Sequence, residues 1–394
     1  MPDQLPAAPP ERPSLAATDF DRAPFLVIWE MTQACDLACR HCRALARPWR
    51  DHAELTTAEA KQLVDSVCAF GRPLFVLTGG DPLKRPDTVP IVEYAARAGL
   101  RVALTPSGTP LMTRDVLQSL RDAGLARLAV SLDGSTALIH DRFRGVAGSF
   151  EWTLRMLEAA RELQLPTQVN TTISHHNVDD LEGLITLMAR LGIVLWSVFF
   201  IVPTGRARSG DLTTADEFER VFHRLYDFSR TAPFDIKTTA APHYRRVVLQ
   251  RQVAERRAAA PPHVPPPLAA SPGFSLGDDI GRAKGVNDGN GFLFVSHRGE
   301  IYPSGFLPLS AGNVRTRDLA TVYRESALFR ALRDPDRLEG KCGVCEFRVV
   351  CGGSRARAFA MTGNPLASDP SCAYIPPRWN TRQQRGEGVQ ERAR

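Results

Sequence analysis

The eight cysteines of the chain form two groups and one isolated residue, Cys68. The first group, Cys35, Cys39 and Cys42, places three thiolates within eight residues. Thiolates are preferred ligands of iron-sulfur clusters, and three of them leave one iron of a cubane open to bind and reduce a chelating molecule. Zinc is the alternative, although zinc usually takes paired CxxC spacing with a fourth ligand nearby. We therefore expect this group to ligate a 4Fe-4S cluster with one free position.

A glycine motif, Gly79-Gly80-Asp81-Pro82, follows the second apolar run of the chain. This motif and the CxxxCxxC spacing, with His41 before the last cysteine, together resemble the radical SAM superfamily, in which Glu is commoner at the position of Asp81. The resemblance implies that S-adenosylmethionine (SAM) chelates the open iron and that its reductive cleavage gives a 5′-deoxyadenosyl radical, which abstracts hydrogen from a substrate. It also implies that backbone free of Cβ atoms approaches the methionyl amine.

The same resemblance implies SAM contacts at later strand ends. The position of Ser107 hydrogen-bonds the SAM ribose or carboxylate in relatives, and Asn170 lies at a comparable place on the fifth strand. Arg144 is a candidate bidentate partner of the SAM carboxylate. Each has an alternative, since Ser and Asn are common in turns and arginine on surfaces. The expected cofactor site comprises Gly79, Gly80, Asp81, Ser107, Arg144, Asn170 and His41.

The second cysteine group comprises Cys342, Cys345, Cys351 and Cys372. Four thiolates close every iron of a second cubane, which leaves no position for SAM. A zinc ribbon is the rival, because spacing alone does not distinguish the metals. The spacing resembles the auxiliary-cluster half of the SPASM or twitch extension of radical SAM enzymes. Ser304 and Arg355 stand where the full SPASM pattern has further thiols, so we expect a single auxiliary 4Fe-4S cluster.

Six apolar runs separated by amphipathic segments position these motifs. The runs are FLVIWEMT, PLFVLTGG, RVALTPSG, RLAVSLDG, PTQVNTTIS and VLWSVFFIVP. Each is typical of a buried parallel strand, and helix caps such as Thr56 with Glu59, Thr214 with Glu217, and Asn177 lie between them. The pattern predicts an α/β fold, a partial (β/α)6 TIM-like barrel whose strand ends share one mouth. A hairpin around residues 297–300 predicts a small C-terminal α+β subdomain for the auxiliary cluster.

Composition suggests five segments along the chain. We expect a mobile N-terminal arm over residues 1–22, the radical SAM barrel over 23–230 and a linker region over 231–290, whose stretch 258–272 is rich in proline. A SPASM/twitch-like domain over 291–375 and a mobile tail over 376–394 follow. Cys68 belongs to an apolar helical stripe with Ala60, Leu63, Val64 and Val67, which favours a core role.

Charge and hydropathy exclude several classes of partner. No apolar run approaches the length of a membrane span, and the N-terminus lacks the apolar centre of a signal peptide. The net charge of +6 comes from basic residues scattered without a block, which gives no support for a nucleic-acid partner. We expect a cytoplasmic, soluble protein without membrane contact, whose cysteines bind metal rather than form disulfides.

Three segments, residues 131–145, 301–314 and 342–372, resemble the branch of haem-pathway radical SAM enzymes that trim propionate and acetate side chains. The resemblance covers roughly residues 23 to 375 and implies radical modification of a tetrapyrrole carboxylate side chain. Arg348, Arg355 and Arg357 are candidate partners of the substrate carboxylates. The alternative is that these arginines are solvated or paired within the protein.

Two other functions stay open. The same barrel and extension serve maturases of ribosomally made peptides, although no separate leader-binding domain is apparent before the barrel. A redox sensor that binds a cluster or zinc without catalysis is the third hypothesis, against which the SAM motifs count. A radical SAM enzyme also needs an electron donor such as flavodoxin or ferredoxin. No catalytic side chain is identified, since His175, His176 and His243 have no partner in view.

Overall fold

The computed structural model describes residues 18–259 and 285–379, and within these ranges ten strands form a single sheet. The strands are β1 Leu26–Glu30, β2 Leu74–Thr78, β3 Arg101–Leu104, β4 Arg127–Ser131, β5 Thr167–Ile173, β6 Leu195–Phe200, β7 Asp235–Thr239, β8 Phe292–Val295, β9 Glu300–Tyr302 and β10 Gly312–Asn313. Strands β1 to β7 are parallel neighbours in chain order, and β8 pairs in parallel with the other side of β1. The predicted α/β partial barrel is confirmed.

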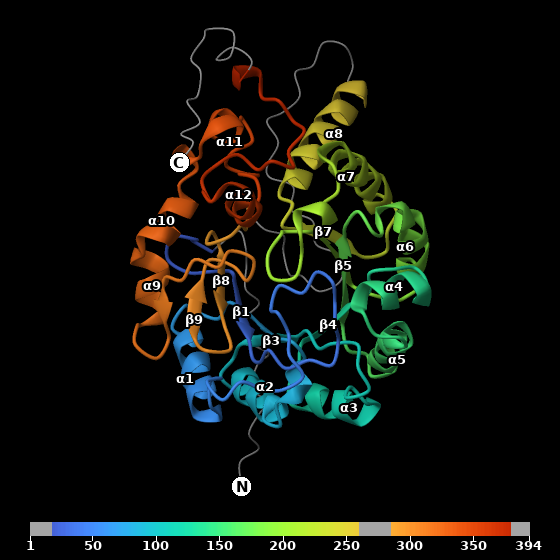
Figure 1. Ribbon diagram of the computed structural model, residues 1–394, viewed down its shortest axis with the longest axis vertical. Coiled ribbons are helices and arrows are strands. Elements are labelled where there is room, and N and C mark those ends of the chain that lie inside the picture. Colours follow the sequence, from blue (N-terminus) through green and yellow to red (C-terminus); the bar gives the residue numbers. More distant parts are fainter. Residues whose placement is uncertain (1–17, 260–284, 380–394) are drawn as a thin grey trace, which may run out of the picture.

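Helices cover the outer face of this sheet. They are α1 Thr57–Cys68, α2 Thr88–Arg97, α3 Arg114–Asp122, α4 Ala137–Arg144, α5 Ser149–Glu162, α6 Leu181–Met188, α7 Ala215–Ser229, α8 His243–Ala259, α9 Leu319–Glu325, α10 Ala327–Arg333, α11 Gly340–Val344 and α12 Arg355–Thr362. In Figure 1, α1 to α7 surround the strands, and α11 and α12 lie together at the top of the view. Within the described ranges, no helix has the length and apolar character needed to span a bilayer.

Two of the three predicted helix starts use their caps as expected. Thr56 with Glu59 and Thr214 with Glu217 form reciprocal capping boxes, in which each side chain satisfies a free backbone N–H. Asn177 does precede a helical turn, but its side chain makes no cap. Its amide nitrogen instead donates to the carbonyls of Asp133 and Thr172, so Asn177 fastens the end of β5 to the loop after β4.

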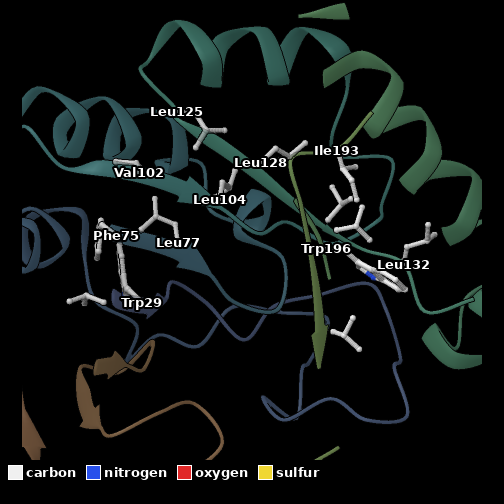
Figure 2. Close-up of a cluster of buried hydrophobic side chains, with 14 of the residues drawn as sticks. Trp29, Phe75, Leu77, Val102, Leu104, Leu125, Leu128, Leu132, Ile193 and Trp196 are labelled. Carbon is white, nitrogen blue, oxygen red and sulfur yellow. The ribbon is translucent and has the colours of Figure 1, made fainter. Parts of the chain in front are cut away.

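The two faces of the sheet differ. Outward side chains such as Trp29, Phe75 and Leu128 are fully buried, and Figure 2 shows them in the layer between strands and helices. Inward side chains such as Ile28 and Val76 are only half-buried. The burial predicted for these strands is therefore complete on the outer face and only partial on the inner face. A closed barrel fills its interior with side chains, whereas this partial barrel leaves part of its inner face open.

The C-terminal segment extends the same sheet. Strands β8 and β9 form the predicted antiparallel hairpin around residues 297–300, and β10 pairs with β9. The Tyr323 hydroxyl on α9 donates to the carbonyl of Phe20 at 2.7 Å, and the Phe20 ring packs against Gly291 at the start of β8. Residues 18–22 are thus packed against the C-terminal segment rather than mobile, and the rest of the predicted arm lies outside the described residues.

The predicted linker over 231–290 is wrong in its first part, where residues 235–239 are β7 and residues 243–259 are α8. Sequence periodicity missed β7 because only one of its faces is apolar, with Ile236 outward and Asp235 and Lys237 inward. Helix α8 is rich in arginine, which masks its buried residues Val247 and Val248. Most of the proline-rich stretch lies outside the described residues, as does the tail after residue 379.

Replacing Leu128 on β4 with alanine should lower the free energy of unfolding by about 2–5 kcal/mol, because the cavity lies in a fully buried layer. Leu138→Ala is the matched control, since that side chain on α4 is 80% exposed. Urea unfolding followed by circular dichroism measures both. Equal stability of the two variants would contradict the packing described for the outer face.

Candidate active site

The loop after β1 carries the first cysteine group to the carboxyl end of the sheet. Cys35, Leu37 and Cys39 are buried together, with Cys42 packed against them. The end of α4 holds this loop through its backbone, since the N–H of Ala38 donates to the carbonyl of Arg144 at 3.1 Å. Burial raises the pKa of the Cys35 thiol to about 11, although a hydrogen bond with Ser107 opposes this effect. Three thiols on one short loop suit a cluster that leaves one iron open.

The glycine motif fastens the cysteine loop to the end of β2. A Cβ atom on Gly79 would lie 2.6 Å from the carbonyl oxygen of Thr32, and one on Gly80 would lie 2.4 Å from that of Ala34. The Gly80 N–H donates to the Thr32 carbonyl at 2.7 Å, and the Asp81 N–H to the Ala34 carbonyl at 2.6 Å. The space that a Cβ would fill thus belongs to the segment before Cys35, so the glycines serve loop packing as well as the predicted approach of a ligand.

Four of the seven predicted cofactor residues line one cavity at the strand ends. They are Gly79, Gly80, Ser107 and Arg144. The Ser107 hydroxyl donates to the Gly80 carbonyl at 2.8 Å and lies 3.2 Å from Cys35 Sγ. The cavity therefore directly adjoins the first cysteine group, as a ligand of the open iron requires.

Arg144 joins this cavity to the cysteine loop through two contacts. Its guanidinium pairs with the buried Asp133 carboxylate at 2.5 Å, and Nη1 lies 3.7 Å from Cys39 Sγ. The backbone N–H of Thr172 donates to Asp133 at 2.6 Å, so the pair is anchored to β5. The surface alternative for Arg144 is excluded, since its side chain is only 11% exposed.

The other three predicted cofactor residues do not line the cavity. Asp81 is fully buried, and its carboxylate accepts hydrogen bonds from Thr109 Oγ1 at 2.8 Å and from the Leu83 N–H at 3.1 Å. This use of its oxygens argues against the predicted direct contact with SAM. Asn170 lies on the inner face of β5, where it accepts from Gln168. His41 packs on the Phe143 ring, and burial and nearby arginines hold its pKa well below the ordinary value, so the ring is neutral.

The four late cysteines line a second cavity, between α8 and α11. Burial raises the pKa of the Cys351 thiol to about 12 and that of Cys345 to about 11. In the described ranges, no three His, Cys, Asp or Glu side chains lie close enough together to hold one metal ion. A zinc ion gathers its sulfurs to about 3.8 Å from one another. The late cysteines thus gather around one cavity without lying at the distances of a single-ion site.

A buried carboxylate, Asp369, organises this second cavity. It pairs with Arg357 at 3.0 Å and with His243 at 3.3 Å, and it accepts from the Ser354 N–H at 2.8 Å. Burial opposes its ionisation, but Arg357 and His243 outweigh burial and hold the pKa of Asp369 well below the ordinary value. Arg357 also donates to the carbonyl of Ile201, just after β6, and so docks the cysteine-rich segment on the strand ends.

The predicted contact of Arg355 and Arg357 with substrate carboxylates is wrong, because both side chains are buried and already paired. Arg355 donates to the carbonyls of Pro365 and Ala367, and Arg357 to Asp369 and two backbone carbonyls. Arg348 reaches the surface, where it pairs with Asp336. The paired alternative therefore holds for these arginines. They stabilise the loops that carry the late cysteines.

The comparisons with known proteins agree with this site. A family model described as the Radical SAM superfamily matches residues 29–188. The AdoMet-dependent heme synthase of Methanosarcina barkeri is 41% identical over 354 residues, which are 90% of this chain and 97% of the relative. The chain belongs to the radical SAM superfamily. A second radical SAM relative, the AdoMet-dependent heme synthase of Oleidesulfovibrio alaskensis, is 40% identical and covers 89% of this chain and 87% of its own length. The predicted resemblance to the haem-pathway branch is confirmed.

Solved structures of radical SAM enzymes share the fold. Streptococcus suis SuiB bound to S-adenosylmethionine superposes with a TM-score of 0.67 at 16% identity, over 90% of this chain and 78% of SuiB. At this identity the likeness extends to the fold alone. It includes the C-terminal segment as well as the barrel, so the whole described architecture is one that radical SAM enzymes use.

Gly80→Ala should prevent correct seating of the cysteine loop, because the new Cβ meets backbone rather than a movable side chain. Overpacking of this kind costs about 1–3 kcal/mol, and we expect loss of most of the iron bound by Cys35, Cys39 and Cys42. Gly210→Ala is the control, since no atom lies within 4 Å of a Cβ at that position. Iron analysis after anaerobic reconstitution and thermal unfolding measure the difference. Full iron occupancy in Gly80→Ala would contradict the role given to this glycine.

Arg357→Ala should lower the free energy of unfolding by about 3–5 kcal/mol, because it leaves the buried Asp369 carboxylate without its main partner. Arg348→Ala removes a guanidinium whose partner Asp336 is 77% exposed, and a change below about 1 kcal/mol is expected. Denaturant titration of both variants tests this. If Arg357→Ala were as stable as Arg348→Ala, the docking role of the buried pair would be wrong.

Proposed function

We propose that this radical SAM enzyme modifies carboxylate side chains of a haem-type tetrapyrrole. The near full-length similarity to AdoMet-dependent heme synthases supports this class of substrate. The observation that carries the proposal in the structure is the division of the inner face into an apolar and a polar part. A tetrapyrrole has the same division, with a flat apolar ring and carboxylates at its edge.

The apolar part of the inner face lies on β1 and β2. Leu26, Ile28 and Val76 are half-buried there, and the register sets Leu26 beside Leu74 and Ile28 beside Val76. Apolar side chains left open to solvent gain free energy when an apolar ligand covers them, by about 25 cal/mol per Å². This part of the sheet therefore suits the face of a macrocycle.

The polar part lies on β4 to β7. Ser131, Asn170, Ser197 and Lys237 are register partners on four neighbouring strands, so their side chains share one row of the inner face. Such groups satisfy carboxylates, which bind poorly to apolar surfaces. A substrate held between the two parts would present its polar edge to this row.

The first cysteine group fits the cluster of the family, since Cys35, Cys39 and Cys42 are gathered on one loop beside a cavity lined by the glycine motif. When bound, the cluster and SAM would supply the one-electron cleavage that gives a 5′-deoxyadenosyl radical. The residues of the chain would orient the cofactor: Ser107 through its hydroxyl, Arg144 through its guanidinium, and Gly80 through its backbone. An electron donor of the flavodoxin or ferredoxin class would supply the electron.

We further propose that Cys342, Cys345, Cys351 and Cys372 hold an auxiliary 4Fe-4S cluster. All four line one cavity, and among the described residues no three His, Cys, Asp or Glu side chains are placed to hold one metal ion, which favours the cluster over the zinc ribbon. At the positions where a full SPASM pattern has additional thiols, Ser304 is buried and Arg355 donates to backbone carbonyls. These side chains support a single auxiliary cluster in this segment.

The alternative functions have weaker support. A peptide maturase has the same fold, but the relatives that share about two fifths of their residues with this chain are named heme synthases. The redox-sensor hypothesis leaves unexplained the cavity beside the first cysteine group, which is lined by four of the residues expected to contact SAM. Reductive SAM cleavage by the purified protein would dismiss the sensor.

Anaerobically reconstituted protein should contain about eight irons, four for each cubane. Simultaneous replacement of Cys35, Cys39 and Cys42 with alanine should leave about four irons and abolish formation of 5′-deoxyadenosine under dithionite. Iron analysis and chromatography of the nucleoside provide the measurements. A triple variant that still cleaves SAM would refute the first site. Twelve irons would revive a third cluster, and four irons with one tightly held zinc would favour the zinc ribbon.

Micromolar protein should change the absorbance spectrum of an iron porphyrin with free propionates. The esterified porphyrin should bind to the protein more weakly. Affinity should fall with added salt without vanishing, because carboxylate contacts are screened whereas apolar burial is not. Absorbance titration with the acid, the ester and a metal-free porphyrin tests this. If no porphyrin binds, or if esters bind as well as acids, the tetrapyrrole proposal fails and peptides become the leading substrates.

A further inference from the structure

Lys237 places a cation on the inner face of the sheet, in the middle of β7. The register pairs Lys237 with Ser197 on β6, Ser197 with Asn170 on β5, and Asn170 with Ser131 on β4. Ser131 also lines the cavity beside the first cysteine group. One row of polar side chains therefore runs from the predicted SAM cavity across three strands to Lys237.

The Lys237 ammonium has no counter-charge in the part of the chain that the structure describes. Among the described residues, no carboxylate forms an ion pair or hydrogen bond with it. The charges that act on it are the like charges of Arg127 and Arg245. Burial, reinforced by these two guanidinium groups, lowers the pKa of Lys237 to about 8.

The neighbouring arginine does not compete for the same role. Arg245 donates from its two terminal nitrogens to the carbonyls of Val350 and Val286, at 3.0 and 2.6 Å, and so serves the loop that carries the late cysteines. Lys237 is half-buried and has no such acceptor within residues 18–259 and 285–379. A desolvated ammonium without a partner is unfavourable, and an arriving carboxylate would satisfy it with a charge-assisted hydrogen bond.

We propose that Lys237 binds a carboxylate side chain of the substrate and thereby fixes which edge of the substrate faces Ser131 and the SAM cavity. This inference rests on the proposed function, because it needs a substrate that carries carboxylates. The apolar residues of β1 and β2 then cover the ring, and the row from Ser131 to Lys237 accommodates its polar edge. Lys237 supplies the substrate contact first assigned to Arg355 and Arg357, which are enclosed by the protein.

Lys237→Met removes the charge and keeps much of the length of the side chain. We expect it to weaken binding of the free-acid iron porphyrin by about tenfold to a hundredfold, the range for loss of one hydrogen bond to a charged group. Binding of the ester should stay within about twofold of wild type. Lys237→Arg should keep most of the preference for the acid. Lys61→Met is the control, since that ammonium on α1 lies over the ring of Tyr94 on α2, and its loss should leave both affinities unchanged.

The outcomes separate the two proposals. If wild type prefers acid over ester and Lys237→Met keeps that preference, the assignment of Lys237 is overturned and the tetrapyrrole function stands. If wild type binds neither form, the proposed function fails and this inference falls with it.

A second measurement avoids any variant. Wild type is treated with an amine-acetylating reagent with and without each porphyrin, and acetylation at Lys237 is quantified by mass spectrometry. The free acid should protect Lys237, the ester should not, and Lys61 should react equally throughout. Equal acetylation of Lys237 in the presence of saturating acid would overturn the proposal.

Discussion

The contact between the cysteine loop and the end of β2 underlies the whole site. Backbone meets backbone there, because Gly79 and Gly80 have no Cβ and the carbonyls of Thr32 and Ala34 occupy the space. This approach fixes the start of the loop that carries Cys35, and Ser107 on the next strand end bonds to both the loop and the glycine motif. The three thiols and the cavity beside them thus form one unit, and a displacement of either would displace the other.

A second constraint ties the cysteine-rich segment to the barrel. Arg357 and Asp369 form a fully buried ion pair, and the remaining donors of Arg357 reach carbonyls that follow β6 and β7. A buried pair of this kind adds little net stability, but removal of one partner is costly because the other charge stays buried. The pair therefore mainly fixes the position of the cysteine-rich segment on the barrel. It holds the late cysteines at the strand ends, on the side of the barrel where the cavity beside the first cysteine group lies.

Between these two fixed regions lies an inner face that the protein leaves partly open. The apolar residues of β1 and β2 are half-buried, as are Ser131, Asn170 and Lys237 of the polar row, whereas Ser197 and the outward side chains are fully buried. The stability of the barrel therefore comes from its outer layer, and the inner layer is free to be specialised for a ligand. Lys237 is the clearest sign of that specialisation, since a half-buried cation that has no counter-charge among the described residues does not stabilise the fold.

The sequence by itself determined the barrel, the two cysteine groups and the superfamily, because these depend on local patterns: apolar periodicity, thiol spacing and a glycine motif. The sequence pattern missed β7, because only one face of that strand is apolar. It also missed α8, because many arginines mask the apolar periodicity of that helix. Only the tertiary structure decided the roles of single polar residues. Arg355, Arg357 and Asp81 have charged side chains of the kind that bind ligands. The packing of distant segments buries them, however, and gives them partners within the protein. Side chains alternate along β7, so Ile236 faces the core and Lys237 faces the partly open inner side of the sheet.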